Sequence, residues 1–156
     1  MDMMQWINDW NTIIRRVIFP DVELKTLMKI PEKTNIINFI DKYFIRAGYT
    51  NKLVENEAVR IVYSDIQGDD TPVPNVKRKM LTFDIYVKIE DLHNVGEDRL
   101  AMRTQLIANR LIQLLTKDRY LQDTGYRFWV AGDWDLGTRT TGYARYCVAF
   151  YYMKVY

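Results

Sequence analysis

The chain has 156 residues, of which 48% are hydrophobic and 27% charged, and its formal net charge is +2 at pH 7. This composition is that of a globular protein and excludes a disordered or low-complexity chain. The small net charge argues against a dedicated nucleic-acid-binding domain, which normally shows a strong basic excess. The length predicts a single domain over residues 1–156, in which a helical N-terminal part (1–57) precedes an α/β core (58–156).

The N-terminus has neither the basic segment nor the small-residue cleavage site of a secretory signal. No apolar run approaches the roughly 18 residues that a membrane helix requires. We therefore expect a soluble protein that is made in the cytoplasm and has no membrane partner. The single cysteine, Cys147, excludes an intrachain disulfide, and its apolar neighbours predict a buried, unreactive thiol rather than a nucleophile.

Apolar residues at helical spacing predict helices in the N-terminal part. The first covers residues 4–18 and stops at Pro20. The second is short and covers residues 22–29. The third begins after Thr34, a suitable N-cap, and its apolar stripe reaches Phe44.

The pattern then changes to the alternation that is typical of β-strands. Apolar residues alternate with polar ones over residues 59–64 and, more clearly, over residues 78–89. The connection between them, residues 65–76, is much longer than the usual hairpin loop of about 2 to 5 residues. It therefore predicts a projecting arm, which carries the adjacent acids Asp69 and Asp70.

The strongest helical pattern covers residues 97–117 and has an apolar face of leucine and isoleucine. A second side of the same helix is basic. This stripe is either a solvated helix face or a charged surface that binds phosphates or an acidic partner, and a nucleic-acid-binding module of this kind would lose affinity steeply with salt. Its members are Arg99, Arg103, Arg110 and Lys117.

Two further strands are predicted at residues 126–131 and 143–155. The second is apolar on both faces, so it must be covered on both sides, by helices of its own domain or by a neighbouring subunit. The order of elements gives an α+β fold. We expect a mainly antiparallel four-stranded sheet (β-β-α-β-β) with the long helix packed across it and additional N-terminal helices.

The sequence offers few groups for catalysis. His93, the only histidine, lies in a polar turn and is predicted to be a surface residue rather than a catalytic base. One cysteine and one histidine cannot supply a zinc site. Asp133 and Asp135 flank Trp134 in a predicted glycine-rich turn, and although two carboxylates can hold Mg²⁺ or Ca²⁺, an ordinary polar turn is the simpler interpretation. We predict no metal and no cofactor.

A metal-dependent nuclease, or another phosphate-acting enzyme, is the alternative from a different class. Asp84 and Lys88 share one face of a strand, and Asp133 and Asp135 would complete the set. The common pattern for such nucleases places an acid two residues before the lysine, and Tyr86 occupies that position. We therefore favour a protein that is not an enzyme.

Four stretches together resemble a known family. They are residues 79–88, the turn with Asn94, the helix over 98–111, and the loop at 133–138 that precedes 142–146. Over residues 59–156 the chain resembles small virion proteins of tailed phages and prophages, and it is similar to the tail-terminator or tail-completion family, whose members include minor tail protein U.

The resemblance implies a sheet flanked by helices and a hexameric ring that ends growth of the tail tube and joins the tail to the head connector. The implied partners are other copies of the chain, the tail-tube protein and the connector or stopper, while DNA only passes through the ring. The implied location is the tail–neck region of the virion. The alternative within the same class is another neck or connector protein.

The subunit interface is expected to use the arm and the C-terminal strands. The residues that we predict for it are Asp69, Asp70, Pro72, Pro74, Arg139, Arg145 and Tyr151.

Overall fold

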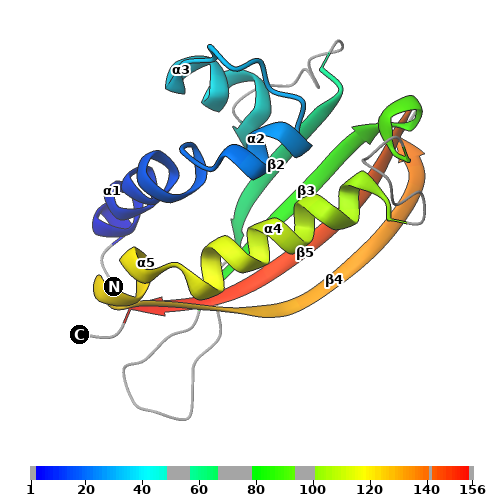
Figure 1. Cartoon of the computed structure of the whole chain (residues 1–156). Helices are drawn as coiled ribbons and strands as arrows, with labels where there is room; N and C mark the ends of the chain where they lie inside the picture. The colour runs from blue at the N-terminus through cyan, green and yellow to red at the C-terminus, as the bar shows by residue number, and fades with distance from the viewer. Residues whose placement is uncertain (1–2, 49–56, 67–78, 94–100, 141, 155–156) are drawn as a thin grey trace.

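The computed structural model describes residues 3–48, 57–66, 79–93, 101–140 and 142–154. A twisted sheet forms one layer, and the helices lie together on one of its faces (Figure 1). The elements in chain order are α1 (Met3–Ile13), the π-helical turn η1 (Ile14–Ile18), α2 (Val22–Leu27), α3 (Ile36–Asn38), the π-helical turn η2 (Phe39–Tyr43), β1 (Phe44–Arg46), β2 (Val59–Ile66), β3 (Lys79–Lys88), the 3-10 turn η3 (Ile89–Asp91), α4 (Arg103–Lys117), α5 (Arg119–Asp123), β4 (Tyr126–Thr140) and β5 (Tyr143–Lys154).

The sheet has five strands in the order β1-β2-β3-β5-β4. The neighbours β2, β3, β5 and β4 are antiparallel, and β1 pairs with β2 in parallel. The α+β class is therefore confirmed, but the expectation of four strands is wrong because β1 adds a fifth. The N-terminal part is accordingly not wholly helical.

The third predicted helix stops earlier than its apolar stripe suggested. Asn35, not Thr34, is its N-cap and accepts a hydrogen bond from the backbone N–H of Asn38 at 2.8 Å. The helical segment ends at Tyr43, and Phe44 continues in extended backbone and pairs with β2. Phe44 is fully buried in this strand, and a short apolar run does not by itself distinguish a helix from an inner strand.

The C-terminal half shows two further differences from the prediction. The long helix α4 begins at Arg103, and Met102 before it has extended backbone. The prediction that the helix starts at residue 97 is therefore wrong at residues 101 and 102, which are not helical. The expected turn over residues 132–140 is instead part of β4, which bends through register shifts as it follows β5. Gly137 has a φ of 61° at one of these irregularities, which favours glycine.

The core lies between the helices and the inner face of the sheet. Alternate residues of β3 point inward and are fully buried, as the spacing predicted. Helix α1 contributes two tryptophans, of which Trp6 stacks on Tyr152 of β5 with ring centroids 4.2 Å apart and Trp10 packs edge-on against Tyr63 of β2. Within the described residues, no helix combines the length and the apolar character that crossing a bilayer requires.

Candidate interaction surface

The two faces of the sheet differ in what covers them. The helices of the described chain lie on the inner face, and none of them lies on the opposite face, which we call the outer face (Figure 1). Most of its side chains are uncharged and half-buried, and its charged members include Arg60, Asp84 and Arg145. The outer face includes Arg60, Val62, Ser64, Met80, Thr82, Asp84, Tyr86, Arg145, Cys147, Ala149, Tyr151 and Met153, together with Trp129 and Trp134 of β4.

Two exposed tryptophans lie on this face along the edge strand β4. Trp134 is 51% exposed and Trp129 is 37% exposed. The Trp134 ring covers Gly132, where an added Cβ would lie 3.2 Å from ring carbons. Trp129 packs beside Tyr151 with ring centroids 5.9 Å apart. Exposed aromatic side chains are enriched at protein interfaces, so the outer face is the candidate interaction surface.

Arg145 forms an ion pair within this face. Its guanidinium lies 3.0 Å from a carboxylate oxygen of Asp84 and 5.5 Å from the ring centroid of Tyr86. Asp133 and Asp135 are not its partners, because both acids lie on the other face of the sheet. Arg145 and Asp84 therefore neutralise each other on the outer face, where Asp84 lies opposite Cys147 and Cys147 lies opposite Trp134.

The single cysteine and the single histidine both lie in unreactive settings. Cys147 is half-buried on the outer face, and burial, together with the nearby Asp84 carboxylate, raises the pKa of its thiol to about 12. The thiolate is therefore scarce at neutral pH, as predicted, but the side chain is half-buried rather than buried. His93 is exposed, as predicted for a surface residue.

The four residues of the nuclease alternative do not come together. Asp84 lies opposite Cys147 on the outer face, whereas Asp133 and Asp135 lie opposite Val148 and Tyr146, on the inner face. The Asp133 carboxylate is also already engaged on the inner face, because the Tyr146 hydroxyl donates a hydrogen bond to it. Within the described residues, no group of three or more metal-ligating side chains is arranged to hold an ion.

Asp133 and Asp135 instead have local structural roles. Asp135 accepts a hydrogen bond from the backbone N–H of Gly137 at 2.8 Å, which stabilises the bend in β4. The hydrogen bond to Asp133, followed by partial burial, raises the pKa of the Tyr146 hydroxyl to about 12. The pair is therefore a neutral hydroxyl bound to a carboxylate across two strands.

The predicted basic stripe of α4 is largely covered by α2. Arg103 is 6% exposed and donates to the backbone oxygens of Leu27 at 2.7 Å and Asp91 at 2.9 Å. Arg110 pairs with Asp21, as described below. Lys117 is exposed, and Arg99 lies outside the described residues. Two members of the stripe thus bind groups of their own chain, and the helical pattern alone could not show that α2 lies over them.

The other predicted interface residues are placed unevenly. Tyr151 and Arg145 both lie on the outer face. Asp69, Asp70, Pro72 and Pro74 of the predicted arm lie outside the described residues, and the side chain of Arg139 is also outside the description. The two tryptophans of the outer face were not predicted. They are five residues apart, and only the bulge between them places both on the same face, which the sequence alone does not show.

Arg60 is a further residue that the sequence did not point to. It is 0% exposed, and none of its three guanidinium nitrogens has a hydrogen-bond partner among the residues described. Burial lowers the pKa of its guanidinium, against the opposite effects of nearby Tyr143, Glu57 and Tyr43. Its place opposite Tyr86 puts it at the same end of the sheet as the Asp84–Arg145 pair.

The ion pair between Asp21 and Arg110 has a predictable dependence on pH. Burial raises the pKa of Asp21, but hydrogen bonds from Arg110 and from the backbone of Leu24 outweigh it, so the pKa lies below its ordinary value of 3.8. A lowered folded-state pKa stabilises the fold above 3.8, and this stabilisation is lost as the pH falls through the folded-state pKa.

We therefore expect Asp21→Asn, which keeps a good N-cap, to lower the free energy of unfolding at pH 7 by about 1–2 kcal/mol. Urea unfolding between pH 7 and pH 2.5 measures the difference from the wild type, which should shrink below pH 4. The control is Asp123→Asn, since Asp123 faces Arg119 at 3.9 Å on the exposed surface and should change stability by less than about 0.5 kcal/mol. A constant difference at all pH values would contradict the assigned ion pair.

Comparison with models of known protein families and with curated proteins gives no match to this chain.

Proposed function

We propose that the chain is a structural protein of a tailed-phage virion, the tail terminator at the tail–neck junction. In this role copies of the chain form a ring, expected to be a hexamer, which ends growth of the tail tube and joins the tail to the head connector. The action is geometric, because a closed ring leaves no site for the next subunit of the tube. The resemblance of residues 59–156 to the tail-terminator family supports the assignment to this class.

The observation that carries the proposal is the outer face. It spans four strands at a spacing of about 4.8 Å and roughly eight residues at about 3.3 Å each, which corresponds to on the order of 500 Å². Covering it with a second protein surface would bury on the order of 1,000 Å² in total, the lower range for a specific interface. This surface pairs Asp84 with Arg145 and presents two exposed tryptophans, which suits association with a second protein surface.

The test is the mass of the protein in solution after Trp134→Glu. We expect the wild type to form an oligomer in size-exclusion chromatography with light scattering, and the variant to be a monomer, since a carboxylate in a desolvated interface centre costs several kcal/mol. Ile89→Glu is the matched control, because Ile89 is 48% exposed but lies in η3, after the end of β3, and this variant should associate normally.

Electron microscopy addresses the location. Labelled protein is expected at the tail–neck junction of phage particles. A wild-type chain that remains monomeric at high concentration and never associates with tails would show that the proposed function is wrong.

A further inference from the structure

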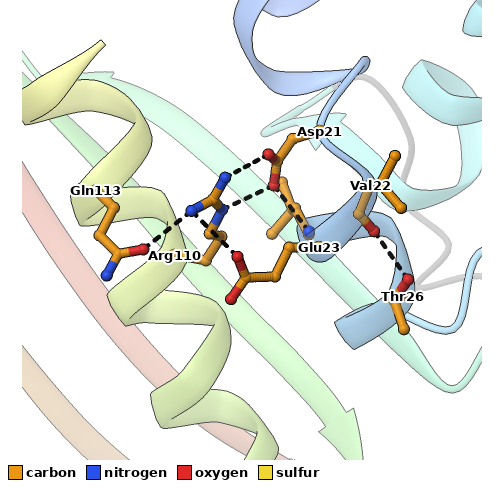
Figure 2. Close-up of polar contacts among 7 residues, drawn as sticks. Asp21, Val22, Glu23, Thr26, Arg110 and Gln113 are labelled. Carbon is orange, nitrogen blue, oxygen red and sulfur yellow. Dashed lines mark hydrogen bonds and ion pairs between the residues drawn. The ribbon is translucent and has the colours of Figure 1, made fainter.

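One buried indole N–H of this chain has no acceptor among the described residues. Trp10 of α1 is 4% exposed, and its N–H makes no hydrogen bond within that part of the chain. Elsewhere polar side chains engage one another, as where Asp21 and Gln113 both contact the Arg110 guanidinium (Figure 2). Buried donors are nearly always paired, because an unpaired donor has lost its water without gaining a partner. The Trp10 N–H is therefore a candidate contact for a ligand.

A small cavity lies beside this N–H, between α1 and the strands β1 and β2. Its volume is about 30 Å³, and a water molecule needs roughly 10–15 Å³, so it has room for about two waters or for a small planar group. Three buried aromatic residues line it, and three exposed polar residues lie at its rim. The aromatic residues are Trp6, Trp10 and Tyr63, and the polar ones are Asn11, Arg46 and Asp65. We call it the α1–β2 cavity.

The rim carries one charge of each sign. Arg46 lies opposite Tyr63 where β1 pairs with β2, and Asp65 follows Tyr63 by two residues on the same strand. Asp65 accepts hydrogen bonds from the Trp6 indole at 3.2 Å and from the Tyr152 hydroxyl at 3.3 Å. A carboxylate has about four acceptor positions, so Asp65 can accept from a further donor.

Tyr63 shows where the donors of the cavity meet. Its ring lies edge-on to the ring of Trp10, with centroids 5.6 Å apart. Burial raises the pKa of the Tyr63 hydroxyl, and the Trp10 N–H and the Arg46 guanidinium act against this rise. The N–H therefore lies near the hydroxyl but not in hydrogen-bonding geometry with it. A ligand oxygen beside this hydroxyl would be within reach of the N–H.

We propose that the α1–β2 cavity binds one uncharged primary amide group, such as the carboxamide of an asparagine or glutamine side chain or of a small free amide. Its carbonyl oxygen accepts from the Trp10 N–H, and its NH₂ group donates to the Asp65 carboxylate. The rim disfavours ions, because Asp65 repels an anion and Arg46 repels a cation. A planar group also suits the aromatic walls. This binding does not depend on the proposed assembly role.

Nuclear magnetic resonance of the indole N–H groups tests the proposal, because each of the four tryptophans gives its own signal. Titration of the full chain with acetamide should move the Trp10 signal downfield and saturate with a Kd on the order of 10 mM, as suits so small a ligand. Acetate and methylammonium at equal ionic strength should give no saturable shift. Trp10→Phe keeps an aromatic ring, identifies the signal and should abolish acetamide binding in saturation-transfer spectra. Trp129→Phe, the same change on the outer face, should leave this binding intact.

Asp65→Asn is a second variant, at an exposed position. It leaves Arg46 as the charge at the rim, so acetate should now shift the Trp10 signal, and acetamide should bind about threefold more weakly without the charged acceptor. The peptides Gly-Gln-Gly and Gly-Glu-Gly distinguish the sources of the amide. Only the first should bind, and tighter binding than that of acetamide would assign the site to a polypeptide partner, whereas equal binding would assign it to a small free amide.

Three results would overturn the proposal. The first is a shift of all four indole signals alike without saturation, which is an effect of the solvent. The second is binding of acetate to the wild type as tight as that of acetamide. The third is a Trp10 signal that no amide moves, since a tightly held water would then fill the cavity.

Discussion

Arg60→Met is expected to unfold at a higher urea concentration than the wild type, with a gain of about 1–4 kcal/mol in the free energy of unfolding. The reason is the cost of holding a charged guanidinium in the protein interior. Arg60 is 0% exposed, and no nitrogen of its side chain is hydrogen-bonded within the described part of the chain. Methionine has a similar length and adapts to irregular space, so it fills the volume without the charge.

Arg103→Met is the matched control, because Arg103 is also buried, at 6% exposure, but is fully engaged. Its guanidinium donates to the backbone oxygens of Leu27 and Asp91, which would be left without these donors. We expect a loss of about 2–3 kcal/mol for this variant. If Arg60→Met were instead destabilised by a similar amount, the favourable effect of the nearby Glu57 carboxylate on Arg60 would outweigh the cost of its burial.

Both measurements are best made in the Trp134→Glu background. Association of folded chains raises the apparent stability by mass action and makes it depend on protein concentration. A monomeric background removes that contribution, so the two arginine variants can be compared directly.

The elements that the sequence predicted well are those in which one periodicity dominates. In β3, alternation of apolar and polar residues identified Leu81, Phe83, Ile85 and Val87 as the inner face, and all are fully buried. Pro20 ended the first helical segment where expected, with η1 finishing at Ile18. Such patterns are local, because the spacing of apolar residues within one element is enough to show which of its sides is apolar.

The elements that were missed depend on pairing between distant parts of the chain. Glycines and polar residues over 132–140 indicated a turn, but β5 supplies hydrogen-bond partners along most of this stretch, and bulges absorb the residues that do not fit a regular strand. The strand β1 likewise exists because β2 lies beside it. Neither partner is visible from local composition.

The same limit applies to the candidate site. The wheel of α4 showed that Arg103 and Arg110 share one side, but it could not show that a helix 89 residues earlier in the chain lies over Arg110. The expectation that β5 must be covered on both faces came from its composition and holds for the inner face. Its outer face contacts no helix among the described residues, which leaves the neighbouring subunit as the proposed cover.

Trp6→Ala is expected to cost about 3–5 kcal/mol in the free energy of unfolding, the usual range for removing a buried large aromatic side chain. Trp6 is 3% exposed and stacks between Trp10, at 5.5 Å, and Tyr152, at 4.2 Å. Its indole N–H donates to Asp65 of β2 at 3.2 Å. The substitution therefore opens a cavity between α1 and the sheet and removes a donor from a carboxylate that also binds the Tyr152 hydroxyl.

The shape of the urea unfolding transition of Trp6→Ala is as informative as its midpoint. Because Trp6 of the N-terminal part packs on strands of the core, residues 1–57 and 58–156 are expected to unfold together, and the variant should keep a single transition at lower urea by both fluorescence and circular dichroism. Trp129→Ala, at a site that is 37% exposed, is the control and should change stability by less than about 1 kcal/mol. Two separate transitions, with only the first one shifted by Trp6→Ala, would mean that the N-terminal helices form a unit of their own.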